Sequence, residues 1–290
     1  MTKQVVGRQR ELELVRAAIA SGAHILLEGP PGTGKSTLLR QVAASRHTEF
    51  VLVEGSAELT PARLIGSFDP ALVLDQGYRP ENFSDGPLVR AMRDGGLLYV
   101  EELNRVPEET INVLLTVMSE GEINVPRLGR VAAADSFRLV AAMNPYDSVG
   151  TSRLSMALYD RTCRISVGYQ DAEQERKIVR LSAEQAKPAL VAEAVALTRA
   201  TREHPDLRYG ASVRGAIDYA RLVPELADIR AVPADDWQAG LDAALTTLSG
   251  RVRRHESCRR SADQVIEEIF RSVRAALSAD SGGGDASPGE

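Results

Sequence analysis

The chain has few cysteines and no long hydrophobic run. Only two cysteines, Cys163 and Cys258, occur among its 290 residues. Two cysteines are too few for a disulfide framework, and they are not spaced like metal ligands. Both are therefore interpreted as reduced structural thiols. No apolar run approaches the roughly 20 residues that span a bilayer, and charges interrupt every apolar run near the N-terminus. The sequence therefore predicts a cytoplasmic protein without membrane insertion.

A net positive charge is also missing. The formal net charge is -5, which argues against nucleic acid as the main partner. One exception is the stretch 251–260, which holds five arginines. It could bind phosphate, but a solvated face flanking a helix is the favoured interpretation. With 43% hydrophobic and 26% charged residues, the chain has the composition of a soluble globular protein with one sizeable core and a smaller second one.

Short apolar runs alternate with helical patterns over the first part of the chain. Strands are expected at 23–28, 50–54, 96–101, 137–143 and 164–167, and helices at about 12–19, 35–45, 88–93 and 107–118. Strands that are separated by helices favour parallel pairing. The sequence therefore predicts an α/β fold, with a parallel five-stranded sheet between helices.

From Asp171 onward the pattern indicates helices only. The expected helices cover 172–187, 191–203, 212–222, 236–253 and 262–278. We therefore expect an α/β domain at 1–168, which carries an insert at about 56–87 and a β-hairpin at about 121–135, and a helical domain at 169–279. Residues 280–290 lack apolar side chains able to repay the entropy of ordering and are expected to form a disordered tail.

The loop after the first expected strand carries the clearest chemical signature. It reads Gly29-Pro30-Pro31-Gly32-Thr33-Gly34-Lys35-Ser36, followed by Thr37, and fits G-x-x-x-x-G-K-[ST] between a strand and a helix. Glycines let consecutive backbone N–H groups converge on phosphate oxygens, and the helix N-terminus adds positive potential. Lys35 would reach the β- and γ-phosphates, and Ser36 would offer its hydroxyl to Mg²⁺. The loop predicts a site for ATP or ADP with Mg²⁺ rather than an ordinary Gly/Pro turn.

Two adjacent carboxylates, Glu101 and Glu102, end the third expected strand. Ligands of open α/β sheets collect at the carboxyl ends of the strands. Glu101 would face the metal through water, and Glu102 would orient or deprotonate the hydrolytic water. Two exposed acids on a loop are the alternative, but the preceding apolar run and the phosphate-binding loop argue against it.

Three segments, EGPPGTGKST, LLYVEELNR and LVAAMNP, together resemble the AAA+ ATPases of the MoxR family, and the similarity runs from about Val5 to Leu222. The resemblance implies an AAA+ core followed by a helical lid domain. Gly7 and Arg8 resemble the element on the adenine side of the nucleotide. Asn144 matches the sensor 1 asparagine, which holds the attacking water together with the catalytic glutamate.

Two arginines acquire roles through the same resemblance. Arg161 ends a segment, 157–161, similar to the one whose arginine acts as a finger on ATP bound by the neighbouring subunit. A guanidinium supplied in this way would make hydrolysis depend on assembly. Arg214 matches the sensor 2 arginine of the lid, which lies over the γ-phosphate of its own subunit. Without the resemblance, Arg161 would be read as a surface ion pair and Arg214 as a solvated helix residue.

The resemblance implies a ring, expected to be hexameric, that remodels, matures or activates a protein client. Family members often act with a separate chain that contains a von Willebrand factor A domain. The segments 56–87 and 121–135 resemble insertions that border the central pore, although protruding solvated hairpins fit them equally well. Glu101 stands where the family usually has Asp, which leaves open a nucleotide-dependent binding switch with weak hydrolysis. A nucleic-acid motor is the least favoured alternative, because the chain is acidic.

Overall fold

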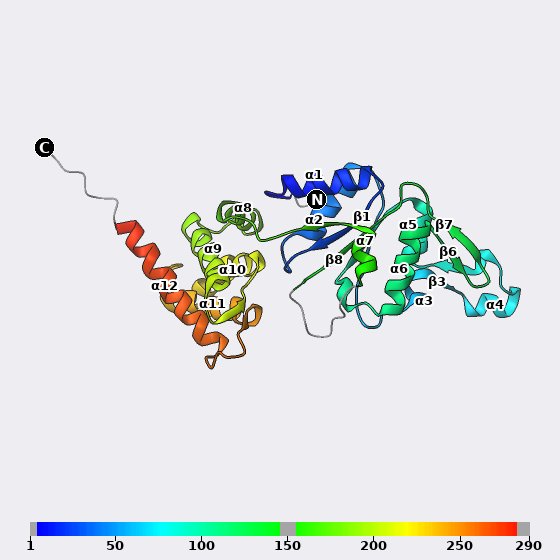
Figure 1. Cartoon of the computed structure of the whole chain (residues 1–290). Coiled ribbons are helices and arrows are strands. Elements are labelled where there is room, and N and C mark those ends of the chain that lie inside the picture. The colour runs from blue at the N-terminus through cyan, green and yellow to red at the C-terminus, as the bar shows by residue number, and fades with distance from the viewer. Residues whose placement is uncertain (1–4, 146–154, 283–290) are drawn as a thin grey trace. The chain divides into compact units, whose positions relative to one another are not determined.

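The computed structural model describes residues 5–145 and 155–282. Its contacts divide the chain into two compact units, the first ending at Gly168 and the second beginning at Tyr169 (Figure 1). Within the described residues, no helix combines the length and apolar character needed to cross a membrane.

The first unit is built on a parallel five-stranded sheet with the order β2-β5-β8-β1-β9. Its strands are β1 (His24–Glu28), β2 (Phe50–Glu54), β5 (Leu97–Glu101), β8 (Arg138–Met143) and β9 (Thr162–Ser166). β1 lies in the interior of the sheet, where Leu27 is paired with Ala142 of β8 on one side and with Ile165 of β9 on the other. The sheet confirms the predicted fold class.

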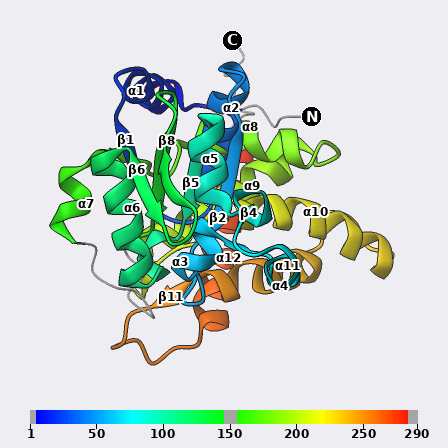
Figure 2. The same ribbon diagram turned by 90° about the vertical axis from the view of Figure 1, so that its right-hand side faces the viewer.

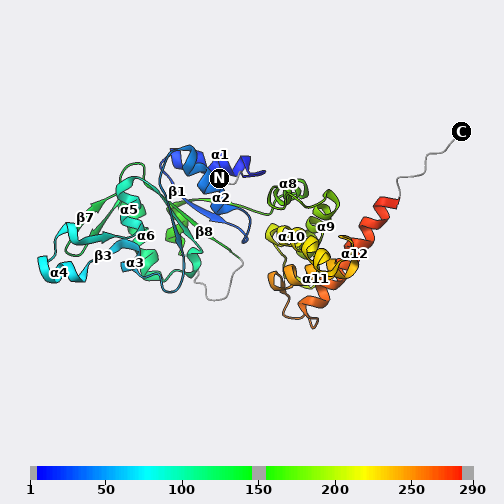
Figure 3. The ribbon, with the colours of Figure 1, turned by 180° about the vertical axis from the view of Figure 1, so that it is seen from behind.

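Helices cover both faces of this sheet. α1 (Gln9–Ala20) and α2 (Lys35–Ser45) lie together, away from α5 (Pro87–Asp94) and α6 (Glu108–Glu120), as Figures 1 and 3 show. Leu27 and Tyr99 belong to the core with α1 and α2, whereas Leu26 and Leu98 belong to the core with α5 and α6. This division follows from the strand period of two, which sends successive side chains to opposite faces.

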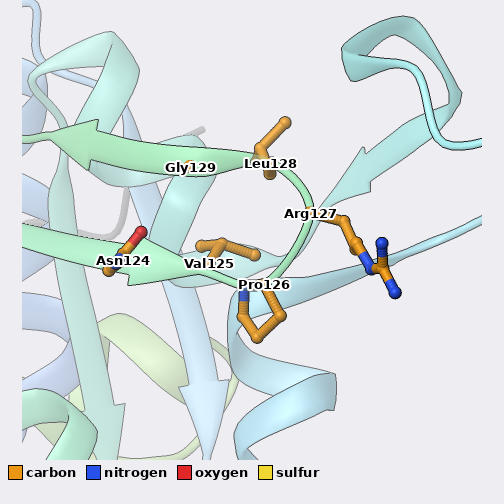
Figure 4. Close-up of a pocket in the computed structure, with 6 residues that line it drawn as sticks. All are labelled: Asn124, Val125, Pro126, Arg127, Leu128 and Gly129. Atoms are coloured by element: carbon orange, nitrogen blue, oxygen red, sulfur yellow. The ribbon is translucent and has the colours of Figure 1, made fainter.

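The segment 56–87 folds into short elements. They are α3 (Pro61–Ile65), β3 (Gly66–Phe68), α4 (Pro70–Gln76), the 3₁₀ turn η1 (Pro80–Asn82) and β4 (Phe83–Asp85), and β3 is antiparallel to β4. An antiparallel hairpin, β6 (Glu122–Val125) and β7 (Gly129–Ala132), forms where the sequence predicted one and lies beside α5 and α6 (Figure 2). At its turn, Arg127 projects away from the hairpin (Figure 4), and its guanidinium lies 5.2 Å from the ring centroid of Tyr78. This contact links the hairpin to the insert.

The second unit is mainly helical. It contains α8 (Ala172–Ser182), α9 (Pro188–Glu203), α10 (Val213–Arg230), α11 (Trp237–Leu248), the 3₁₀ turn η3 (Ser249–Arg251) and α12 (Ala262–Gly282). The prediction of helices alone was wrong, because β10 (Leu207–Tyr209) and β11 (Arg253–Arg254) form a small antiparallel sheet. Leu207 and Val252 are buried in the core of this unit, and their burial brings the two segments together.

Several predicted helix bounds also needed correction. α8 ends at Ser182 rather than at 187, and α11 ends at Leu248 rather than at 253. α10 was predicted to stop at 222, but it continues through Pro224 to Arg230, and Val223 and Ala227 of this added part are buried. α12 reaches Gly282, so residues 280–282 are helical and not part of the predicted tail. The rest of that tail, 283–290, lies outside the described residues, and its disorder stays a prediction.

The arginine-rich stretch 251–260 is held by local contacts. Arg251 pairs with Asp218 at 2.5 Å, and Arg260 pairs with Asp206 at 3.1 Å and also with Glu268. These ion pairs neutralise part of the positive charge of the stretch 251–260. They support its interpretation as a solvated face that flanks a helix.

Candidate nucleotide-binding site

The predicted phosphate-binding loop joins the end of β1 to the start of α2. Gly32 and Gly34 have φ of 73° and 86°, in the left-handed region that favours glycine. Gly29 lies so close to β9 that a Cβ there would stand 2.1 Å from the carbonyl oxygen of Val167. Its N–H donates to the carbonyl of Met143 at 3.1 Å. Backbone geometry alone therefore favours glycine at these three positions of the motif.

Lys35 lies over this loop and is only 7% exposed. Its Nζ donates to the carbonyl oxygens of Gly29 and Pro30, both at 2.9 Å. Thr33 Oγ1 donates to the Pro30 carbonyl at 3.0 Å. An ammonium has three donors and a flexible stem, so it can exchange carbonyl oxygens for phosphate oxygens without leaving the loop.

Ser36 and Glu101 meet where the start of α2 adjoins the end of β5. Ser36 Oγ donates to the Glu101 carboxylate, at 3.1 Å from Oε1 and 3.2 Å from Oε2. A hydroxyl and a carboxylate are the hard oxygen ligands that Mg²⁺ prefers, and phosphates and waters usually complete its shell. Among the residues that the structure describes, no group of three or more His, Cys, Asp or Glu could hold a metal. A metal here would therefore depend on the nucleotide phosphates.

The hydroxyl of Tyr99 is buried beside this pair. Desolvation by burial, followed by the charge of Glu101, raises the pKa of Tyr99 far above its usual range, so the phenol stays protonated. Ser36 and Glu101 lie near enough to affect the pKa of Tyr99. Even so, the Tyr99 hydroxyl makes no hydrogen bond of ordinary geometry among the described residues. Tyr99 was not predicted to belong to the site, although strand periodicity places it on the same face as Glu101.

Glu102 begins the 3₁₀ turn η2 (Leu103–Arg105) with a φ of 52°, which is unusual for a residue with a side chain. Its carboxylate is 40% exposed and pairs with Arg105 at 3.0 Å. The neighbouring Gly55, just after β2, donates its N–H to the Glu101 carbonyl at 2.8 Å. A Cβ on Gly55 would lie 2.5 Å from the carbonyl oxygen of Glu102. Gly55 thus allows β2 to approach the turn that presents Glu102.

Arg8 reaches the phosphate-binding loop from the N-terminal side. Its buried guanidinium donates to the carbonyls of Thr33 at 3.0 Å and Gly168 at 2.6 Å, and to Glu11 Oε1 at 2.8 Å. The preceding Gly7 has a left-handed φ of 66°. The Arg8 side chain therefore connects the loop to Gly168, the last residue of the first unit. The contact with an adenine ring, predicted for Gly7 and Arg8, stays a prediction.

The structure places Asn144 directly after β8, next to Met143, whose carbonyl accepts from Gly29. The predicted sensor 1 residue therefore lies just past the end of β8, near the edge of the loop. Arg214 is exposed in the first turn of α10, in the second unit. Its predicted place over the γ-phosphate stays a prediction.

Arg161, the predicted finger, follows α7 (Met156–Asp160) and is partly exposed. Its Nε donates to Ser119 Oγ of α6 at 2.5 Å, and Nη1 donates to the Ala157 carbonyl at 3.0 Å. These bonds hold the guanidinium at the surface of α6 and α7.

A buried carboxylate, Glu28, lies directly before the loop and was not singled out by the sequence analysis. It accepts a hydrogen bond from Tyr159 Oη at 3.0 Å and pairs with Arg164 of β9. Desolvation, followed by the hydrogen bond to Glu28, raises the pKa of Tyr159. Glu28 thereby connects the base of the loop to α7, the helix that precedes Arg161.

The fold and the loop together define a P-loop nucleotide-binding protein, and comparisons with known proteins refine that class. The AAA domain family, dynein-related subfamily, matches residues 24–162. An uncharacterized protein of Staphylococcus haemolyticus is 30% identical over 215 residues, which cover 72% of this chain and 81% of that protein. The gas vesicle ATPase GvpN of Haloferax mediterranei is 27% identical, with 89% of this chain and 76% of GvpN covered. The chain belongs to the AAA+ ATPase family.

A solved structure supports the fold alone. A mutant of the RuvB protein of Thermotoga maritima superposes with a TM-score of 0.56 at 17% identity, covering 97% of this chain and 84% of RuvB. The AAA+ fold expected from the sequence is thus confirmed.

Proposed function

We propose that this chain is a ring-forming ATPase of the MoxR type, which couples ATP hydrolysis to remodelling, maturation or activation of a protein client. The observation that carries the proposal is the Ser36–Glu101 hydrogen bond at the start of α2, with Lys35 and Glu102 on the adjoining elements. This is an arrangement suited to a nucleotide with Mg²⁺, and membership of the AAA+ family supports it.

Each residue of the site has a defined part in the proposed reaction. Lys35 would release the Gly29 and Pro30 carbonyls and bind the β- and γ-phosphates. Ser36 and Glu101 would hold Mg²⁺, which when bound neutralises phosphate charge. Glu102 would leave Arg105 and accept a proton from the attacking water, which Asn144 would orient.

Substitution of Glu102 tests this division of roles. Glu102→Gln keeps the shape of the side chain but removes its basicity, so phosphate release should fall at least about a hundredfold while ATP binding persists. Glu109→Gln, on the first turn of α6, is a matched control and should hydrolyse ATP at the wild-type rate. Unchanged turnover in the Glu102 variant would remove Glu102 from its proposed role.

Assembly is the second part of the proposal. Arg161 would act on ATP bound by the neighbouring copy in a hexameric ring, where its charge would stabilise the transferred phosphoryl. ATP turnover per protomer should then rise with protein concentration, and this rise should disappear in Arg161→Ala. Arg271→Ala removes an exposed arginine of α12 and should behave as the wild type. Turnover that is independent of concentration and of Arg161 would refute the role of the arginine as a finger.

The proposed partners are a protein client and a separate chain with a von Willebrand factor A domain. Nucleic acid is not proposed as a partner, because the chain is acidic and part of its arginine-rich stretch is held in ion pairs.

A nucleotide-dependent binding switch is a second candidate function, favoured by two observations. Glu101 occupies the position where the MoxR family usually has Asp, and the Glu102 carboxylate is paired with Arg105. Tight ATP binding without turnover, in the assembled state and with the client present, would favour the switch over the motor.

A further inference from the structure

The Tyr99 hydroxyl is a buried donor without a bond, placed at the predicted metal side of the site. Its Oη is inaccessible and lies near enough to Ser36 and Glu101 to interact with both, yet it makes no hydrogen bond of ordinary geometry in the part of the chain that the structure describes. The polar side chains beside it are those of Ser36 and Glu101, which are already bonded to each other. Buried donors are seldom left unpaired, because each unpaired donor costs free energy.

Packing holds the Tyr99 ring in place. The side chain is fully buried in the core between the sheet and α2, which also contains Leu27 and Leu39. The ring centroid lies 5.9 Å from that of Phe50 on the adjoining strand β2. Glu101, in contrast, is partly exposed and ends its strand. The Glu101 side chain is therefore less tightly packed than Tyr99 and can change its rotamer more easily.

We propose that Tyr99 is a positioning residue for the metal-side carboxylate, and that its hydroxyl donates a hydrogen bond to Glu101 when nucleotide and Mg²⁺ are bound. This role rests on the proposed function. Glu has one more methylene than Asp and so has more rotamers to lose when it is fixed. The rigid Tyr99 hydroxyl would select one rotamer of Glu101 and so offset the entropy cost of fixing its side chain.

The hydrogen-bonding capacities of the three groups are compatible with this role. Ser36 donates its single hydrogen to Glu101 and keeps its oxygen lone pairs for a metal. A carboxylate has about four acceptor sites, so Glu101 can accept from both Ser36 and Tyr99 and still face metal-bound water. Tyr99 would not contact the metal.

The test measures metal binding directly. Mn²⁺ is titrated by electron paramagnetic resonance into the full-length protein saturated with ADP, and ADP affinity is measured separately in EDTA. Tyr99→Phe should weaken Mn²⁺ binding about tenfold, the value of one hydrogen bond to a charged group, and leave ADP affinity in EDTA unchanged. Its thermal stability should hardly change, because the native hydroxyl makes no hydrogen bond of ordinary geometry in the free protein.

Two further variants make the result specific. Tyr219→Phe removes a buried hydroxyl bonded to Glu193 in the second unit and should leave Mn²⁺ affinity unchanged. In a Glu101→Asp background, the carboxylate is one methylene shorter and should lie farther from the Tyr99 hydroxyl, so Tyr99→Phe should cause little further loss. Unchanged Mn²⁺ affinity in Tyr99→Phe, an equal loss in the Asp background, or an equal loss of ADP affinity in EDTA would each overturn the role. If the wild type fails to bind ADP at all, the proposed function fails, and this role fails with it.

Discussion

Gly55 provides a stringent test of how the strands position the two glutamates. An alanine Cβ at this position would lie 2.5 Å from the Glu102 carbonyl oxygen and 2.7 Å from that of Glu101. Carbon and carbonyl oxygen normally stay at least about 3.3 Å apart, so the backbone of β2 or η2 would have to move by roughly 1 Å. Such overpacking costs about 1–3 kcal/mol, against a gain of about 0.4–1 kcal/mol from the stiffer unfolded chain.

Gly55→Ala should therefore destabilise the first unit by about 1–2 kcal/mol. For a unit of this size the midpoint of thermal unfolding should fall by about 4 °C. The chain has a single tryptophan, Trp237, which lies in the second unit. Tryptophan fluorescence thus follows the second unit, while far-ultraviolet circular dichroism follows both. The circular dichroism transition should therefore shift.

The control for this substitution is Gly250→Ala, since a Cβ on Gly250 would have no atom within 4 Å. This variant should be as stable as the wild type or slightly more stable. ATP turnover of Gly55→Ala should fall as well, because the displaced turn carries Glu102. A Gly55→Ala protein that melts at or above the wild-type temperature would refute the inferred close approach, and so would a shift confined to the Trp237 signal.

Three further predictions concern charged or titrating groups. Lys35→Ala should weaken ADP binding at least about tenfold with little change in melting temperature, as measured by calorimetry; equal affinity would argue against the loop as the phosphate site. Burial, followed by the charge of Arg138, lowers the pKa of His24 to about 4, so the unfolded state takes up the proton first as pH falls from about 6.5 to 4. Stability should therefore drop by about 1–2 kcal/mol between pH 7 and pH 5 in urea titrations, after allowance for the partial exposure of His24, and His24→Gln should remove this part of the pH dependence. Glu175 is buried and pairs with Arg202 at 2.8 Å, so Glu175→Ala should cost about 3 kcal/mol and lower the melting transition seen by Trp237 fluorescence; an unchanged transition would contradict the burial of this pair.

The sheet and the position of the glycine-rich loop could be predicted because their signals are local. Four of the five strands, β1, β2, β5 and β8, contain a short apolar run, and the loop motif is contiguous between Gly29 and Ser36. β10 and β11 are too short to show any periodicity, and their pairing depends on the burial of Leu207 and Val252 from distant segments. Local propensity predicts that α10 ends near Pro224. The helix continues because Val223 and Ala227, on either side of Pro224, are buried in the core of the second unit.

The parts of the site that the sequence analysis missed depend on packing between distant segments. Tyr99 reads as one more apolar residue of a strand, and the neighbours of its hydroxyl are set by how α2 packs on β5. Glu28 reads as the polar end of β1, whereas its partners Tyr159 and Arg164 come from far along the chain. The sequence around Tyr99 and the sequence around Glu28 therefore contain no motif that would predict these contacts.

The interior position of β1 in the sheet has a consequence for synthesis of the protein. β1 emerges early from the ribosome, but its two neighbours, β8 and β9, are made much later, as the pairing of Ile25 with Val140 and Cys163 shows. Until those strands appear, both hydrogen-bonding edges of β1 are open, and the Met143 carbonyl that anchors Gly29 does not yet exist. A nascent chain that ends before β8 would therefore have the complete loop sequence but would lack the contacts of Gly29 with Met143 and Val167. The loop should reach its final geometry only after most of the first unit has been translated.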